Sequence, residues 1–326
     1  MKALVTGATG FVGRHLVGEL LSRGWECRCL VRNPVDAPKN GAELWPGDVT
    51  DEASIRGIAR GVDAVFHLAA CGGVTAVSPE ERRKMHSVNV EGTRNMLVEC
   101  ADEPIARFVH FSSTAAMGCT GRIYIDEATP CLPVTAYQRS KFEAEKVVEV
   151  FAERGGVPAV IIRPCMIYGP GPRQGAFLKF CRMFKRGVFP RLPGRVFVPI
   201  VYVKDVAAAA IAAAERGAPG QIYLIAGSEA VDIHDLRRWV IDALKIDPPY
   251  IGAPLPLLKA AVWGVEVFSR IFRVRPPVTL ANLKMTLSSR RFSTEKARLA
   301  IGFVASANPR QCVRETVLSL VDQGLL

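Results

Sequence analysis

A phenol and an ammonium group lie four residues apart at Tyr137 and Lys141. On a helix, this spacing places both side chains on one face. A free phenol has a pKa near ~10, too high for a base at neutral pH, and a nearby ammonium would lower it. Tyr137 could then accept a hydroxyl proton as hydride leaves a carbinol carbon, or return that proton during reduction. Such pairs are common on helices, so this interpretation depends on the segments that precede the pair.

A glycine-rich turn near the start of the chain indicates a nucleotide cofactor. The apolar run at residues 1–5 predicts a buried strand, and three glycines follow it before a segment with helical apolar spacing. Gly7 allows the tight turn, Gly10 lets the backbone approach a diphosphate, and Gly13 lets helix and strand pack closely. The helix N-terminus would face the diphosphate with free N–H groups. These glycines are each three residues apart, whereas the usual fingerprint places its first two only two apart.

The end of the second predicted strand indicates which cofactor is bound. In NAD-preferring sites, an acidic residue near this strand end holds the ribose hydroxyls. Here the strand at 26–31 is followed by Arg32, and the nearest acid, Asp36, lies in the expected loop. A guanidinium group suits a 2′-phosphate. We therefore expect NADP(H) to be preferred, with NAD(H) as the alternative.

Further motifs follow the glycine turn at 47–51, 65–70, 89–93, 111–118, 163–171 and 201–207. Together with the Tyr/Lys pair, they give the chain a pattern that resembles the extended short-chain dehydrogenase/reductases, the NAD(P)-dependent epimerase/dehydratase family. The branch that looks nearest holds 3β-hydroxysteroid dehydrogenases and dihydroflavonol-4-reductase-like enzymes. The resemblance covers about the first two-thirds of the chain. It is specific as a combination, although each motif alone would be weak.

The resemblance implies roles for several side chains. The hydroxyl residue of the family motif lies five residues before a closing glycine, here Gly118, which selects Ser113. Ser113 would bind the substrate oxygen and orient it towards Tyr137, with Thr114 as the alternative donor. Lys141 would also hold the nicotinamide ribose. The residues expected to contact the cofactor are Gly7, Thr9, Gly10, Phe11, Val12, Gly13, Arg32, Asp48, Val49, Leu68, Ala69, Ala70, Tyr137, Lys141, Pro164 and Ile167.

Two departures from the family pattern concern the substrate. Nucleotide-sugar members carry an arginine for the diphosphate where this chain has Val198. Dehydratases place an acidic pair where it has Ala115 and Ala116. Both absences favour interconversion of a ketone and a secondary alcohol on an apolar substrate, of a steroid, flavonoid or long-chain keto-acid kind. Substrate contacts are expected from Thr114, Arg173, Phe177, Phe180 and the region near Trp263.

Two other functions stay open. A nucleotide-sugar epimerase or dehydratase could use Arg191 or Arg195 in place of the missing arginine. A redox sensor or scaffold could bind NADP without turnover, although proteins of that kind usually lack the Tyr/Lys pair. Retained binding of a UDP-sugar would favour the first alternative.

Strand patterns alternate with helical patterns, which predicts an α/β fold with a doubly wound, parallel Rossmann sheet. An NADP-binding domain is expected over 1–165 with about 196–226, and a smaller, discontinuous substrate region over about 166–195 and 227–326. Asn89 is expected to tie a helix to a strand, and Arg163 to form an ion pair or a backbone anchor. Strands are expected at 2–6, 26–31, 62–68, 106–112, 158–162 and 221–225, and helices at 51–60, 79–100, 136–154, 207–214 and 233–244.

Composition limits the remaining classes. The 326 residues are 49% hydrophobic and 22% charged, which is ordinary for a soluble protein, and the net charge of +11 comes without a nucleic-acid-binding module. Nine cysteines without a Cys-x-x-Cys motif and five histidines without ligand spacing predict no metal site and a reducing, cytoplasmic compartment. No signal peptide is expected, because the first strand begins at once. We expect a homodimer formed through 79–100 and 136–154.

The apolar stretch at 255–272 has three charges, Lys259, Glu266 and Arg270. It is interpreted first as a helix that closes the substrate pocket or forms an oligomer contact. The alternative is an interfacial helix that allows peripheral contact with a membrane.

Overall fold

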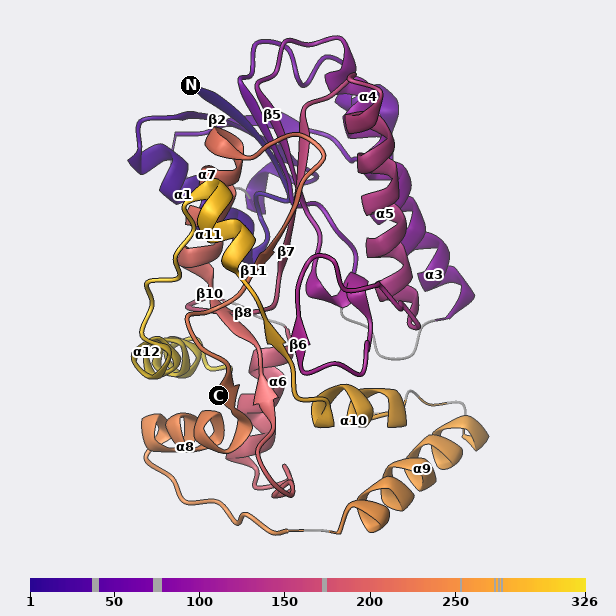
Figure 1. Ribbon diagram of the computed structural model, residues 1–326, viewed down its shortest axis with the longest axis vertical. Helices are drawn as coiled ribbons and strands as arrows, with labels where there is room; N and C mark the ends of the chain where they lie inside the picture. The colour runs from indigo at the N-terminus through magenta and orange to yellow at the C-terminus, as the bar shows by residue number, and fades with distance from the viewer. Residues whose placement is uncertain are drawn as a thin grey trace.

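A seven-stranded parallel sheet lies at the centre of the computed structural model, which describes residues 1–36, 41–72, 78–171, 175–252, 254–272, 274, 276 and 278–326 (Figure 1). Its strands are β1 (Lys2–Thr6), β2 (Glu26–Val31), β3 (Glu43–Pro46), β4 (Ala64–His67), β5 (Arg107–Phe111), β7 (Ala159–Pro164) and β11 (Ile222–Ile225). The strand order is β11-β7-β5-β4-β1-β2-β3. The order reverses between β1 and β4, where open α/β sheets bind ligands beyond the carboxyl ends of their strands. The predicted doubly wound α/β fold is confirmed.

Helices cover both faces of this sheet (Figure 1). One face carries α1 (Phe11–Ser22), α7 (Val203–Arg216) and α11 (Glu295–Ile301), and the other carries α3 (Pro79–His86), α4 (Gly92–Ala101) and α5 (Ala136–Glu153). Along β1, Ala3 and Val5 belong to the core under α1, whereas Leu4 belongs to the core under α4 and α5. Successive strand side chains point to opposite faces, so a strand covered on both sides needs a continuous apolar run.

The C-terminal part of the chain forms a third core beyond the carboxyl end of the sheet (Figure 1). It is built around Tyr168, Phe184 and Val313. Its helices are α6 (Ala176–Lys185), α8 (Ile233–Leu244) and α12 (Pro309–Asp322). Three short strand pairs lie outside the main sheet: β8 (Met166–Tyr168) with β10 (Ile200–Tyr202), β9 (Phe197–Val198) with β12 (Val231–Asp232), and β6 (Tyr124–Ile125) with β13 (Arg291–Phe292).

Two predicted helices are interrupted. The helix expected over 51–60 is only α2 (Glu52–Ile55), because Gly57 adopts φ +73° and turns the chain. The helix expected over 79–100 is split into α3 and α4 by a π-helical turn at Ser87–Glu91. The strand at 26–31 and the helix at 233–244 lie where they were predicted.

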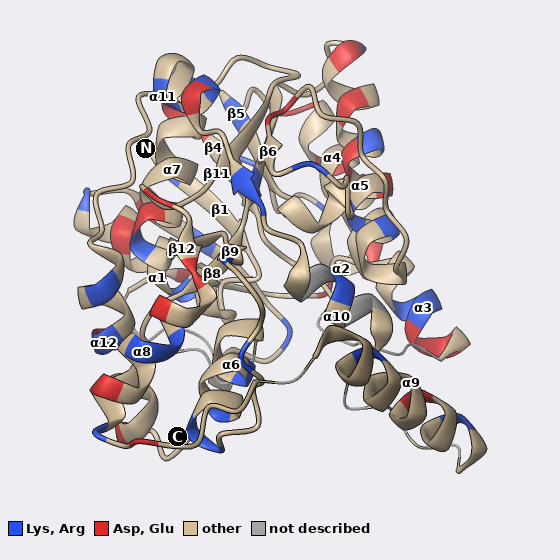
Figure 2. Cartoon of the chain, turned by 60° about the horizontal axis from the view of Figure 1, so that its bottom comes forward, with Lys and Arg blue, Asp and Glu red and all other residues tan. Residues whose placement is uncertain are grey.

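The apolar stretch at 255–272 does form a helix, α9 (Leu255–Ile271), which packs against α10 (Leu280–Leu287) at the edge of the molecule (Figure 1). Val262 and Ser269 are its buried side chains. The opposite side exposes large apolar groups, namely Leu257, Trp263, Phe268 and Ile271. Figure 2 shows few charges along this helix. None of the described helices is long and apolar enough to cross a bilayer.

Candidate active site

The glycine turn joins β1 to α1 and leaves no room for side chains. Gly7 adopts φ +68°, and a Cβ there would lie 2.9 Å from the amide nitrogen of Ala69. A Cβ on Gly13 would lie 2.2 Å from the carbonyl oxygen of Gly7, and one on Gly10 would lie 3.1 Å from the same atom. No side chain caps the N-terminus of α1, so its first N–H groups remain available to a ligand. This cradle fits the diphosphate of a dinucleotide cofactor.

The ends of β1 and β4 are tied together beside this turn. The Thr6 hydroxyl oxygen accepts hydrogen bonds from the amides of Leu68 and Ala69, each at 3.1 Å, and contacts His67 Nδ1 at 2.9 Å. The other ring nitrogen of His67 lies 3.0 Å from the Thr93 hydroxyl, and burial lowers the pKa of His67 to about 3. His67 is therefore a neutral link between the sheet and α4. The Thr6 hydroxyl that it contacts holds the backbone at 68–69, next to the glycine turn.

The expected adenosine contacts lie along the same edge. One Asp48 carboxylate oxygen accepts from the amide and hydroxyl of Thr50, at 2.9 and 2.8 Å. Val49 is buried, and a Cβ on Gly92 would lie 2.7 Å from its Cγ2 atom. Arg32 lies exposed just past β2, and no described residue holds its guanidinium.

Ser113 and Tyr137 are brought together at the carboxyl end of the sheet. Ser113 follows β5, and its hydroxyl accepts from the Ala115 amide at 3.1 Å. Tyr137 lies in the first turn of α5. Thr135 and Gln138 cap the N-terminus of this helix with a capping box. Burial raises the pKa of Tyr137, and a hydrogen bond with Ser113 opposes this rise. The phenol and the hydroxyl thus form one polar pair.

Gly72 completes the setting of Tyr137 and was missed by the sequence analysis. A Cβ at this position would lie 2.4 Å from Cε2 of the Tyr137 ring. Any side chain here would displace the phenol. The only signal in the sequence is that Gly72 follows the motif at 65–70 by two residues, which alone does not reveal a contact with a helix far along the chain.

Lys141 lies one turn beyond Tyr137 and is buried. Its ammonium donates a 2.8 Å hydrogen bond to the carbonyl of Phe111, the last residue of β5. Burial lowers the pKa of Lys141 to about 8, and the Glu145 carboxylate opposes that change. Burial of the phenol dominates the pKa of Tyr137 and Ser113 supplies the opposing contact, so an effect of Lys141 on that pKa stays a prediction.

A buried ion pair stands behind Lys141. Glu145 has no exposed surface and accepts hydrogen bonds from Arg163 Nε at 2.9 Å and Nη2 at 2.7 Å. The Ser112 hydroxyl also donates to this carboxylate. Arg163 therefore forms the ion pair that was one of its two expected roles. Ser112 faces this buried network, whereas its neighbour Ser113 faces Tyr137.

Asn89 occupies the π-helical turn between α3 and α4. Its amide nitrogen donates to the Cys71 carbonyl at 2.8 Å and to the Ser140 hydroxyl at 2.9 Å, and its oxygen accepts from the Cys71 amide at 2.7 Å. The wide turn carries the side chain between the strand end and α5. Asn89 thus ties the segment next to Gly72 to the helix that bears Tyr137.

The expected substrate residues are more scattered. Thr114 is buried beside Ser113, whereas Arg173 lies outside the described residues. Phe177 is 2% exposed and stacks on Tyr168, so its ring belongs to the C-terminal core, and Phe180 packs half-buried beside it. Trp263 on α9 is 60% exposed. Pro164 is buried at the end of β7 and Ile167 is half-buried in β8.

Fold and site together define a dinucleotide-binding oxidoreductase. A family model described as the NAD dependent epimerase/dehydratase family matches residues 3–226, and the chain belongs to that family. It is an NAD(P)-dependent enzyme of the oxidoreductase type.

Named relatives match over nearly the whole chain. A 3-beta-hydroxysteroid dehydrogenase from Mycolicibacterium neoaurum is 32% identical, covering 98% of this chain and 92% of the relative. A 4-hydroxy-2-methyl-3-oxo-4-farnesyl-3,4-dihydroquinoline-1-oxide ketoreductase from Stigmatella aurantiaca is 28% identical, covering 95% and 94%. The crystal structure of gox2253 superposes with a TM-score of 0.82 at 28% identity over 99% of each chain. A UDP-glucose 4-epimerase from Thermotoga maritima shows the same fold, with a TM-score of 0.79 at 20% identity over 99% of each chain.

Proposed function

We propose that this enzyme interconverts a ketone and a secondary alcohol on an apolar substrate with NADP(H). The pairing of Ser113 with Tyr137 at the carboxyl end of the sheet carries the proposal. The bound nicotinamide would supply or accept the hydride. Ser113 orients the substrate oxygen by a hydrogen bond, and Tyr137 donates a proton to that oxygen during reduction or accepts it during oxidation.

Lys141 has two tasks in this proposal. Its ammonium is held at the end of β5 by the Phe111 carbonyl, one helical turn from Tyr137, where the nicotinamide ribose of the family cofactor would lie. A positive charge at this place also favours the phenolate. Because burial lowers the pKa of Lys141 to about 8, the charge is present at neutral pH and is lost as the pH rises further.

The preference for NADP(H) rests on Arg32. The guanidinium is exposed just beyond β2, where a ribose-binding acid would stand in an NAD-preferring site, and no described residue neutralises it. It is therefore free to pair with a 2′-phosphate.

An apolar substrate is supported by two observations. At the place of the diphosphate-binding arginine, Val198 lies half-buried in β9 and pairs with Val231 of β12. The relatives at 28% and 32% identity are named for a farnesyl-quinoline ketone and for steroids. A valine cannot neutralise a diphosphate, and a buried unpaired diphosphate is strongly disfavoured.

A screen of ketones tests the proposal by the loss of NADPH absorbance. Steroid, flavonoid and long-chain keto-acid substrates should be compared with nucleotide sugars. Tyr137→Phe should abolish turnover of an active ketone and leave NADPH binding nearly intact, because only the proton-transfer oxygen is lost. A near-normal rate in Tyr137→Phe would overturn the mechanism.

Nucleotide-sugar epimerisation is the second candidate, because the description of the matched family names epimerases. Calorimetry with UDP-glucose on the NADP-loaded protein separates the two. Weak or absent binding at the catalytic site is expected, with no conversion of the UDP-sugar. Micromolar binding together with such conversion would promote the epimerase function, with Arg191 or Arg195 as the replacement cation.

We also propose that α9 allows the enzyme to contact a membrane from a reducing, cytoplasmic compartment. The exposed side of α9 is apolar over several turns, while Lys259 and Arg270 are also exposed along it. This arrangement suits a helix lying in the interface of a bilayer. Flotation with liposomes, compared between the native chain and a variant carrying Trp263→Ser and Phe268→Ser, tests it, and equal flotation of the two would exclude α9 as the contact.

A further inference from the structure

A cavity of about 740 Å³ lies between α8, the segment 191–194 and the segment 250–252. The Arg191 amide donates to the Ile251 carbonyl at 2.9 Å and holds the two segments together. Three arginines, Arg191, Arg237 and Arg238, line this cavity, and its described lining contains no aspartate or glutamate. Neither the Ser113/Tyr137 pair nor the glycine turn contributes to it.

Arg237 is a buried cation with no acidic partner among the described residues. Its side chain is 94% buried, since 6% is exposed. One nitrogen, Nη2, donates to the Pro248 carbonyl at 2.7 Å, and the guanidinium carbon lies 4.0 Å from the centre of the Tyr250 ring. The Nε atom is buried without a hydrogen-bond partner. A buried charge of this kind is strongly unfavourable unless an opposite charge reaches it.

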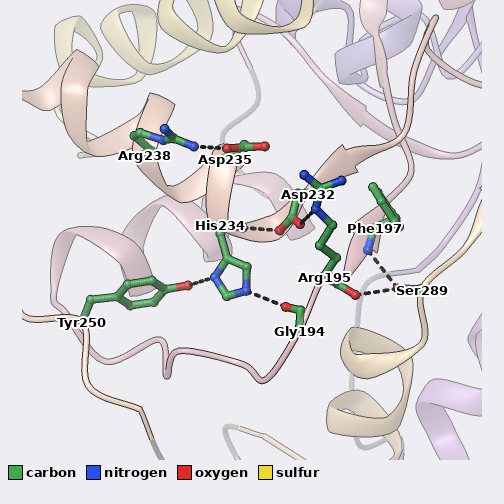
Figure 3. Close-up of polar contacts among 9 residues, drawn as sticks. All are labelled: Gly194, Arg195, Phe197, Asp232, His234, Asp235, Arg238, Tyr250 and Ser289. Carbon is green, nitrogen blue, oxygen red and sulfur yellow. Dashed lines mark hydrogen bonds and ion pairs between the residues drawn. The ribbon is translucent and has the colours of Figure 1, made fainter.

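The Tyr250 ring, which lies under the Arg237 guanidinium, is held in place by His234. His234 Nε2 lies 3.0 Å from the Gly194 carbonyl, which can only accept, so this nitrogen carries the proton. His234 Nδ1 then accepts from the Tyr250 hydroxyl (Figure 3). Tyr250 is thus held as a rigid platform for the guanidinium, on the side of the cavity formed by α8.

The acidic residues close to the cavity already have hydrogen-bond or ion-pair partners. Asp235 pairs with Arg238, and Asp232 accepts from the His234 amide and lies 3.9 Å from Arg195 (Figure 3). Arg191 is exposed, and no described residue forms an ion pair with it. Two guanidinium groups of one cavity, Arg191 and Arg237, therefore lack a counter-charge.

We propose that this cavity binds the phosphate or diphosphate group of a small organic anion, outside the catalytic site. Guanidinium groups bind phosphate oxygens through paired hydrogen bonds. The volume is that of an organic ligand pocket, and Leu192 and Ile241 offer apolar contacts for the remainder of the molecule. The segment with Tyr250 precedes α9 in the chain, so the phosphate can belong to a soluble ester or to a lipid headgroup.

Calorimetry on the NADPH-loaded protein tests the site with inorganic pyrophosphate and with glycerol 1-phosphate. The native chain should bind one equivalent, and Arg191→Gln and Arg237→Gln should each weaken binding by about tenfold or more. Arg154→Gln is the matched control, because Arg154 is an exposed arginine at the far end of α5. NADPH binding should be unchanged in all variants, which shows that they fold. Arg191→Gln alters an exposed side chain, so it remains informative if Arg237→Gln is unstable.

Vesicle flotation separates the two sources of phosphate. Binding of the soluble anions that depends on Arg191 identifies a soluble ester. Arg191-dependent flotation with phosphatidylcholine vesicles that contain phosphatidylglycerol, without binding of soluble anions, identifies a lipid headgroup. The proposal is overturned if the native chain binds neither the two soluble anions nor the vesicles, or if it binds them no better than Arg191→Gln and Arg237→Gln do.

Discussion

Replacing Glu145 by glutamine should weaken both the fold and the charge of Lys141. The carboxylate has no exposed surface and accepts two hydrogen bonds from Arg163, which is 3% exposed. Glu145→Gln keeps one acceptor oxygen but leaves the guanidinium buried without a counter-charge. Breaking a buried pair on one side costs about 3–5 kcal/mol, and the retained acceptor argues for about 3 kcal/mol. A domain of ordinary stability remains folded after such a loss.

Glu149→Gln is the matched control on the same helix. Glu149 lies one turn further along α5 and pairs at 2.6 Å with Lys146, whose side chain is 55% exposed. Exposed pairs contribute about 0–1 kcal/mol, so this variant should unfold almost as the native chain does. Urea titrations followed by circular dichroism measure the free energy of unfolding of both variants. A loss below about 1 kcal/mol in Glu145→Gln would refute the assignment of a stabilising buried pair.

The same substitution gives a second measurement, the pH dependence of NADPH oxidation. The Glu145 carboxylate holds the pKa of Lys141 up, against the burial that lowers it to about 8. Lys141 is charged below this pKa and neutral above it, so the reductive rate should fall as the pH rises through about 8. Without the carboxylate the pKa drops further, and the alkaline limb should move to lower pH. An unmoved limb would show that Glu145 does not act through Lys141.

Three shorter predictions follow. Gly72→Ala should lower kcat by roughly 10–100-fold, because the added Cβ displaces the Tyr137 ring. Gly264→Ala is the control, since a Cβ there would have no atom within 4 Å, and equal kcat values in the two variants would contradict the contact. Arg32→Ala should weaken NADPH by about 1.5–3 kcal/mol and spare NADH, and equal losses in the two dissociation constants would exclude a 2′-phosphate role. Light scattering should give the mass of a homodimer, formed through α4 and α5. Val98→Glu places a charge at an exposed position of α4 and should dissociate this dimer. A monomer mass for the native chain would count against the prediction.

Local signals were enough for much of the fold. The strand at 26–31 is an apolar run, and the helix at 233–244 has a clear stripe and Asp232 as its cap, whose carboxylate accepts from the His234 amide. The strand β3 was missed, because it is a short edge strand with Glu43 and Pro46 at its ends. Edge strands are often short, charged or ended by proline, so they carry little apolar pattern.

The site was predictable where chemistry follows from adjacent residues. The glycine turn and the Tyr/Lys spacing are visible in the sequence, because both are set within one turn or one helix. The Glu145–Arg163 pair and the approach of Gly72 to Tyr137 are not, since they join elements that meet only in the folded chain. The π-helical turn at Asn89 is likewise fixed by contacts with Cys71 and Ser140, and not by local preference.

The two successive serines explain how stability and chemistry share one strand end. Extended backbone sends neighbouring side chains to opposite sides, so Ser112 reaches the buried Glu145 carboxylate while Ser113 reaches Tyr137. Tyr137, Lys141 and Glu145 are spaced four residues apart on α5 and therefore share one face of it. The anchor between Glu145 and the strand end thus sets the register of this helix against β5. It fixes the phenol opposite Ser113 through the Ser112 hydroxyl, which is not one of the proposed catalytic groups.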